Sequence, residues 1–164
     1  SVSGVGYAPE GGFQLDGRTL AEPPADVTEL ARAGLLCNDA ALAAQADGTW
    51  RLVGDPTEGA LLTLALKAGL ETGAAQAGLP RVDEIPFDAA YAYMATLHHD
   101  HAGHARIYLK GAPERVLELC ARQAGGAALD PAYWSAALDA AGRRGERVLA
   151  LARLGVARGT HALA

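Results

Sequence analysis

Two short stretches of the chain place residues that could recognise a purine. Phe87 follows a proline at the expected start of a strand, where an aromatic ring can offer the flat apolar face on which a base stacks. Lys110 is one of two lysines and ends another expected strand; Gly111 and Ala112 follow it and allow a ligand to approach the backbone closely. The alternatives are an ordinary core phenylalanine and a solvated lysine at a strand end.

A helix start supplies two further polar side chains. Asp55 stands at the N-cap position, a proline fits the first helical position, and Glu58 lies three residues after the cap, as in a capping box. Thr57 and Glu58 can therefore serve the helix alone. They can also face a ligand, because both roles need the same orientation of the glutamate.

The stretch from His98 to His104 combines four histidines with Asp100. Imidazole and carboxylate groups bind Zn²⁺ or Ni²⁺, so a metal-binding module through this stretch is the alternative function. A hairpin loop, however, gives its side chains little rigid support. We therefore favour a solvated turn and assign no metal ligand.

Several motifs of self-contained enzymes are missing from the sequence. The chain has no G-x-x-x-x-G-K-[ST] phosphate loop, no G-x-G-x-x-G between a strand and a helix, no G-x-S-x-G elbow and no H-E-x-x-H pair. No nucleophile and base stand at a supportive spacing either. A stand-alone hydrolase is the less favoured reading, and no residue is assigned as catalytic.

Length, composition and charge further limit the kind of protein this chain can be. The chain has 164 residues, 14 Lys and Arg, 19 Asp and Glu, and a formal net charge of −5. This length suits one domain with its own core or at most two small ones, and we expect a single domain over residues 1–164. The acidic balance argues against nucleic acid as a partner. No apolar run approaches the roughly 18 residues of a spanning helix. The opening, which has no start Met, is that expected of a piece excised from a longer protein.

The elements that must position these residues alternate between strands and helices, and many connections look like hairpins. This pattern favours an α+β fold on a mostly antiparallel sheet. We expect a helix capped by Asp26 that ends near Cys37, a helix from Pro56 to Gly69, and a loop containing Gly73 and Gly78. The other expected elements are a hairpin around residues 13–20, two strands within 40–53, strands at 85–88, 91–98 and 105–110, helices at 113–122 and 131–143, and a strand at 147–153.

Four segments in this order resemble one family. They are Cys37-Asn38-Asp39-Ala40, Gly54-Asp55-Pro56-Thr57-Glu58-Gly59-Ala60-Leu61, Pro86-Phe87-Asp88 ending at Met94, and Lys110-Gly111-Ala112-Pro113-Glu114. The set is similar to the nucleotide-binding (N) domain of type II P-type cation-transporting ATPases, the calcium and sodium/potassium pumps. The opening residues 4–11 and the late segment 147–152 match as well, so the resemblance covers nearly the whole chain.

The resemblance implies a fold and a set of site residues. The fold would be a six- to seven-stranded, mostly antiparallel sheet flanked by helices. Phe87 would stack on adenine, Lys110 would lie at the base of the adenosine pocket, and Glu58 would accept a hydrogen bond at the adenine amino group. The remaining residues implied to contact the nucleotide are Thr57, Met94, Gly111, Ala112, Arg147 and Leu149. A buried methionine that only fills the core is the alternative for Met94.

The resemblance also implies what the domain does. It would hold ATP (Mg-ATP in the full pump) so that the γ-phosphate passes to an aspartate on a separate phosphorylation domain. The chain contains no Asp-Lys-Thr-Gly-Thr segment, which bears that aspartate in the family. The expected partners are ATP and the phosphorylation and actuator domains of the same pump, at the cytoplasmic face of a membrane, and the isolated domain is expected to be monomeric and not catalytic.

The sequence departs from the family between Phe87 and Met94. Ala92 stands where the family carries a lysine near the phosphates, and Ala89 and Ala90 precede it. Losing a cation beside a triphosphate should weaken binding. Natural divergence and engineered surface alanines both account for this stretch.

Overall fold

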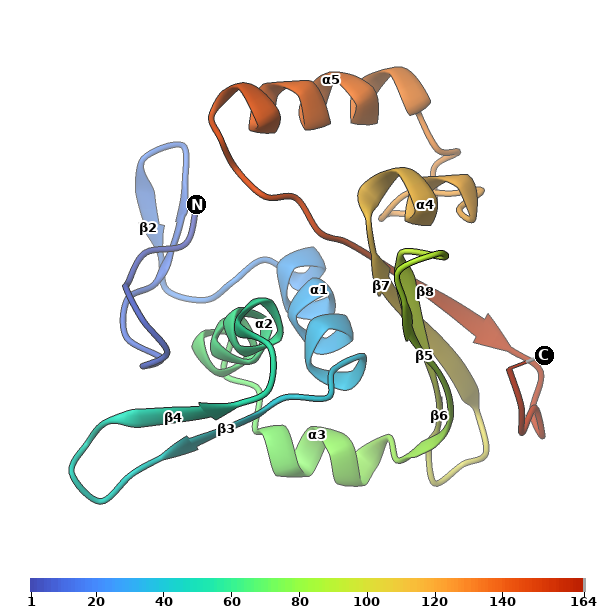
Figure 1. Cartoon of the computed structure of the whole chain (residues 1–164), viewed down its shortest axis with the longest axis horizontal. Helices are drawn as coiled ribbons and strands as arrows, with labels where there is room; N and C mark the ends of the chain where they lie inside the picture. Colours follow the sequence, from blue (N-terminus) through green and yellow to red (C-terminus); the bar gives the residue numbers. More distant parts are fainter. Residues whose placement is uncertain (164) are drawn as a thin grey trace. The chain divides into compact units, whose positions relative to one another are not determined.

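The computed structural model describes residues 1–163 and divides the chain into two compact units (Figure 1). The first unit spans Ser1–Pro80, and the second starts at Arg81. Each unit is described by itself. The expectation of one domain over residues 1–164 stays a prediction.

The first unit combines two hairpins with three helices. Its elements are β1 (Phe13–Leu15), β2 (Arg18–Leu20), α1 (Ala25–Leu36), β3 (Ala41–Ala44), β4 (Trp50–Val53), α2 (Pro56–Lys67) and α3 (Thr72–Gly78). β1 pairs with β2 and β3 with β4, both antiparallel, and Figure 1 shows the β3–β4 hairpin reaching away from the helices. The core lies where α1 packs on α2, with Leu35, Leu36 and Leu62 almost completely buried.

The two helix starts of this unit differ from each other. Asp55 caps α2 as expected, because its carboxylate accepts hydrogen bonds from the backbone N–H groups of Thr57 (2.7 Å) and Glu58 (3.3 Å). The cap predicted for α1 is wrong. Pro24 holds the N-cap position without a side-chain hydrogen bond, and Asp26 lies inside the first turn, where a carboxylate still favours the positive end of the helix.

Helix α3 replaces a predicted loop. The segment holds Gly73 and Gly78, but Ala74, Ala75 and Ala77 are strong helix formers and lie between the two glycines. The alanines outweigh the glycines, and the segment winds into two turns.

The second unit is an antiparallel sheet with two helices. The sheet order is β5 (Arg81–Asp88), β6 (Tyr93–His99), β7 (Ala105–Gly111) and β8 (Ala150–Val156). Helix α4 (Pro113–Glu118) lies against β7 and β8. Helix α5 (Pro131–Arg143) lies beyond α4, and an extended connection leads from it into β8 (Figure 1).

The α+β class and the antiparallel pairing are confirmed. Within residues 1–163 the strands are distributed over three sheets, one of four strands and two of two strands, where a single six- to seven-stranded sheet was expected. Among these residues no helix is both long and apolar enough to cross a bilayer.

Several predicted boundaries in the second unit are wrong. β5 begins at Arg81 instead of Ile85, and β6 begins at Tyr93 instead of Tyr91. β8 begins at Ala150 instead of Arg147, because Ala150 pairs with Gly111, the last residue of β7, and earlier residues lie beyond that strand. Helix α4 ends at Glu118 instead of Arg122. Residues 122–128 form a small turn closed by an isolated bridge between Arg122 and Ala128.

Candidate functional site

The register of the four-stranded sheet gathers part of the predicted set in one row. Met94 of β6 pairs with Lys110 of β7, and Lys110 pairs with Leu151 of β8. On β5 the register shifts between Ile85, which pairs with Ala95, and Asp88, which pairs with Tyr93. Two residues, Pro86 and Phe87, therefore stand opposite Met94 in a bulge. Bulges re-aim side chains and are frequent beside binding sites.

Phe87 is a surface residue. Its side chain is 62% exposed, whereas Phe13, the other phenylalanine, is 5% exposed. The alternative of a core phenylalanine is therefore wrong for Phe87. A large apolar ring held open to solvent on a strand can stack against a planar ligand.

Met94 and Lys110, on the two strands that follow β5 in the sheet, are buried. Met94 is 2% exposed and Lys110 is 6% exposed. The lysine is therefore not a solvated charge at a strand end. Burying an ammonium group is costly unless polar partners surround it, so lysine is seldom buried to this extent.

Gly111 and Ala112 meet another part of the chain. A Cβ atom on Gly111 would lie 2.5 Å from the carbonyl oxygen of Ala92, and the N–H of Ala112 donates to that same oxygen at 2.8 Å. Ala92 itself has a positive φ of 58°. We expected a ligand to approach the backbone closely at Gly111. The hairpin turn between β5 and β6 makes this close approach instead, because only a glycine leaves room for the Ala92 carbonyl.

Arg147 and Leu149 lie outside the sheet. They belong to the connection between α5 and β8, where Arg147 is exposed and Leu149 is half-buried. An exposed guanidinium is available to a phosphate or ribose group.

Thr57 and Glu58 belong to the first unit. Thr57 is exposed and Glu58 is half-buried at the start of α2. The Glu58 carboxylate accepts a hydrogen bond from the backbone N–H of Asp39 at 3.4 Å, and the Asn38 side chain donates to the Glu58 carbonyl at 3.0 Å. These bonds tie α2 to the segment after α1, so Glu58 has a structural role. The part of Thr57 and Glu58 in nucleotide binding stays a prediction.

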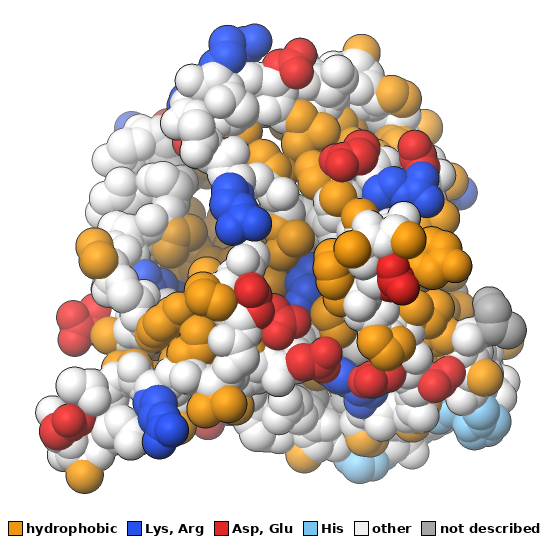
Figure 2. All heavy atoms as spheres, in the orientation of Figure 1, with side chains coloured by type: hydrophobic (Ala, Val, Ile, Leu, Met, Phe, Trp, Pro, Cys, Tyr) orange, Lys and Arg blue, Asp and Glu red, His pale blue; other side chains and the backbone are white. Residues whose placement is uncertain are grey.

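The histidine stretch is engaged in contacts of its own. The ring of His104 lies 2.8 Å from the Asp100 carboxylate through Nδ1 and 2.7 Å from Arg158 through Nε2, and His99 Nε2 lies 2.5 Å from the Thr160 carbonyl. The hydrogen bond from His104 lowers the pKa of the Asp100 carboxyl. All five histidines belong to the second unit, and Figure 2 shows pale-blue imidazole groups at the surface.

This geometry does not favour the metal-binding alternative. Among residues 1–163, His, Cys, Asp and Glu side chains form no group of three or more that could hold a metal ion. The acceptor nitrogen of His104 faces a guanidinium, which also excludes a cation from that position.

A buried polar row on β6 and β7 was not predicted. Thr96 and Tyr108 are fully buried and His98 is 2% exposed. His98 Nε2 lies 2.9 Å from Thr96 Oγ1, and its ring meets that of Tyr108 edge-on at 5.5 Å between centroids. The Tyr108 hydroxyl has no hydrogen-bond partner among the described residues. The polar residues alternate along both strands in the sequence. This alternation could have indicated the row, but it equally fits a strand face exposed to solvent.

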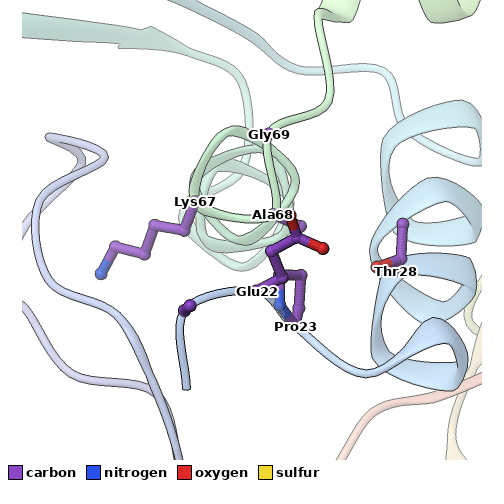
Figure 3. Close-up of a pocket in the computed structure, with 7 residues that line it drawn as sticks. Glu22, Pro23, Thr28, Lys67, Ala68 and Gly69 are labelled. Carbon is purple, nitrogen blue, oxygen red and sulfur yellow. The ribbon is translucent and has the colours of Figure 1, made fainter. Parts of the chain in front are cut away.

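A surface pocket of about 340 Å³ lies in the first unit (Figure 3). The figure shows the Lys67 side chain pointing away from Glu22, and its ammonium donates to the Ser3 carbonyl at 2.7 Å. None of the predicted site residues lines this pocket, whose walls are Ala21, Glu22, Pro23, Thr28, Lys67, Ala68 and Gly69.

Comparison with known proteins places the chain in a family. Residues 26–160 match the family described as P-type ATPase, cytoplasmic domain N. Over 158 residues the chain is 43% identical to the probable cation-transporting ATPase F of Mycobacterium tuberculosis, covering 91% of this chain and 17% of that protein. It is 45% identical over 125 residues to the cation-transporting ATPase pma1 of Synechocystis sp., covering 73% of this chain and 14% of that protein.

A third relative is the calcium-transporting ATPase of Bacillus subtilis, 34% identical over 122 residues, which cover 74% of this chain and 14% of that protein. The chain thus spans less than a fifth of the length of each of these three relatives. The chain belongs to the family of P-type ATPase cytoplasmic N domains.

Proposed function

We propose that this domain binds ATP through its second unit, with the adenine ring stacked on Phe87. The single observation that supports this most is the exposed Phe87 ring on the β5 bulge, opposite the paired residues Met94 and Lys110. An exposed aromatic ring and a buried cation in the same sheet are the two kinds of group that an adenine nucleotide contacts.

Within this proposal each residue of the row has a distinct role. Phe87 supplies the stacking surface, and Met94 supports the floor beneath it with a soft, polarisable side chain. Lys110 contributes positive charge at the base. Arg147, exposed before β8, is a permanently charged fork suited to the ribose or phosphate end.

The domain positions the nucleotide and leaves the chemistry to other parts of the protein. In phosphoryl transfer most of the catalytic effect comes from positioning and electrostatic stabilisation. We propose that the γ-phosphate is presented to an aspartate on a separate phosphorylation domain, with Mg²⁺ neutralising the phosphates. No residue of this chain is assigned a covalent step.

The names of the relatives extend the proposal to the whole protein. Those of Mycobacterium tuberculosis and Synechocystis sp. are named for cation transport, and that of Bacillus subtilis for calcium transport. We propose that the full protein is a cation-transporting pump of the membrane, in which this domain works with phosphorylation and actuator domains on the cytoplasmic side.

Isothermal titration of the 164-residue chain with ATP and with adenosine tests the proposal. We expect both ligands to bind, because stacking and the buried lysine act on the nucleoside. We also expect Lys110→Met, which keeps the length of the side chain, to weaken both. The proposal fails if neither ligand binds at millimolar concentration while circular dichroism shows a folded chain.

A further inference from the structure

The hairpin turn after Phe87 carries no cation of its own. Residues 88–93 are Asp-Ala-Ala-Tyr-Ala-Tyr, and the carboxylate of Asp88 accepts a hydrogen bond from the N–H of Ala90 at 2.7 Å. A triphosphate bound beside Phe87 needs positive charge near it. That charge must therefore come from another element.

Helix α4 brings a guanidinium to this turn. Nε of Arg115 donates to the carbonyl oxygen of Tyr91 at 3.4 Å, the peptide directly before Ala92. The Ala112 N–H, at the N-cap of α4, donates to the Ala92 carbonyl at 2.8 Å. The start of α4 thus holds two successive carbonyls of the turn, and Arg115 is held at Tyr91, four residues after Phe87 in the sequence.

Resting on the proposed function, we infer that Arg115 is the specificity-determining residue for the phosphate groups of the nucleotide. It would distinguish ATP from adenosine by contacting phosphate oxygens at the mouth of the β5–β6 turn. A side chain from α4 thereby supplies the charge that the turn itself does not have.

Part of the Arg115 guanidinium is available to donate hydrogen bonds to phosphate oxygens. Nε is used by Tyr91, and Nη1 lies 2.5 Å from the Glu118 carboxylate. Nη2 has no hydrogen-bond partner among residues 1–163. The side chain is 44% exposed, so the two N–H groups of Nη2 are open to solvent and to a ligand.

Acidic groups around Arg115 determine how strongly its positive charge can attract a phosphate. Glu118 neutralises part of its charge, and Glu114 and Asp88 are exposed acids on α4 and on the hairpin. Removing the Glu118 charge should therefore strengthen ATP binding, whereas removing the Arg115 charge should weaken it. These opposite signs separate a phosphate contact from a purely structural strut between α4 and the hairpin.

The experiment compares ATP and adenosine affinities by isothermal titration for the wild type and for Arg115→Gln, Arg115→Lys and Glu118→Gln. Arg122→Gln is the matched control, because it removes the same charge from an exposed arginine outside the hairpin contact. We expect Arg115→Gln to weaken ATP about fivefold and leave adenosine within twofold. Arg115→Lys should retain most of the ATP affinity, Glu118→Gln should raise it, and the control should change neither ligand.

Salt dependence adds an independent readout. The advantage of ATP over adenosine should shrink as sodium chloride rises from about 0.05 to 0.5 M in the wild type, and should be about fivefold smaller in Arg115→Gln at the lowest salt concentration. Equal losses for ATP and adenosine in Arg115→Gln, or an unchanged ATP affinity, would overturn the inference and leave the proposed function standing. A wild type that binds neither ligand would end both.

Discussion

Replacing Phe87 with alanine should separate ligand binding from folding. The ring is 62% exposed, so little more than a third of its surface is removed from water in the fold. Fully burying a phenylalanine contributes about 1.5–3 kcal/mol, so the substitution should lower the free energy of unfolding by less than about 1 kcal/mol. A base stacked on an aromatic ring contributes about 1–3 kcal/mol, so ATP affinity should fall by roughly 5- to 150-fold.

The assay pairs isothermal titration with urea unfolding, and the chain offers two controls. Phe13→Ala removes a phenylalanine that is 5% exposed and should destabilise the fold by about 3–5 kcal/mol. Tyr91→Ala removes a ring that is 55% exposed on the same hairpin and should leave adenosine affinity nearly unchanged. Phe87→Trp should keep binding. The reasoning is refuted if Phe87→Ala binds ATP within twofold of the wild type, or destabilises the fold as much as Phe13→Ala.

Three further predictions concern the framework. Asp55→Ala removes two hydrogen bonds from the start of α2 and should lower the free energy of unfolding by about 1 kcal/mol in urea titrations. Gly111→Ala should destabilise the second unit by at least about 1–3 kcal/mol in the same assay, because the added Cβ meets backbone at 2.5 Å, whereas Gly155→Ala, with open space around it, should not. The pKa of Asp100, lowered in the fold by the hydrogen bond from His104, should rise toward its ordinary value in His104→Ala when followed by NMR titration. Because the folded pKa is depressed, this contribution to stability is present above the unfolded pKa and is lost as pH falls through the folded one.

The elements that depend on local signals could be predicted from the sequence. The Asp55-Pro56 pair identifies the start of α2, because capping and the fixed φ of proline act within one turn. The same signal at Asp130-Pro131 identifies α5, whose cap accepts a hydrogen bond from the N–H of Tyr133. The α+β class followed from the alternation of such segments.

Features set by tertiary pairing could not be predicted. The start of β8 depends on where β7 ends, which no residue of β8 encodes. Strand alternation placed Lys110 on a face with Tyr108, but it carries no information about whether that face is covered. The glycine at 111 was expected to admit a ligand, and it admits the Ala92 carbonyl because the hairpin turn folds back onto the end of β7.

The contact between Arg115 and the Tyr91 carbonyl has the same origin. It joins residues 24 positions apart and exists because α4 begins where β7 meets the turn. The sequence predicts an arginine in a short helix, and no local pattern connects this arginine with Phe87.

NMR chemical-shift mapping of the ¹⁵N-labelled chain during an ATP titration most directly tests the claim that the second unit binds the nucleotide at Phe87. We predict that the largest shifts cluster on the row across the second unit, at Phe87, Met94 and Lys110, and on the turn that follows Phe87. Shifts confined to the Lys67 pocket of the first unit, or to the histidine stretch, would contradict the account.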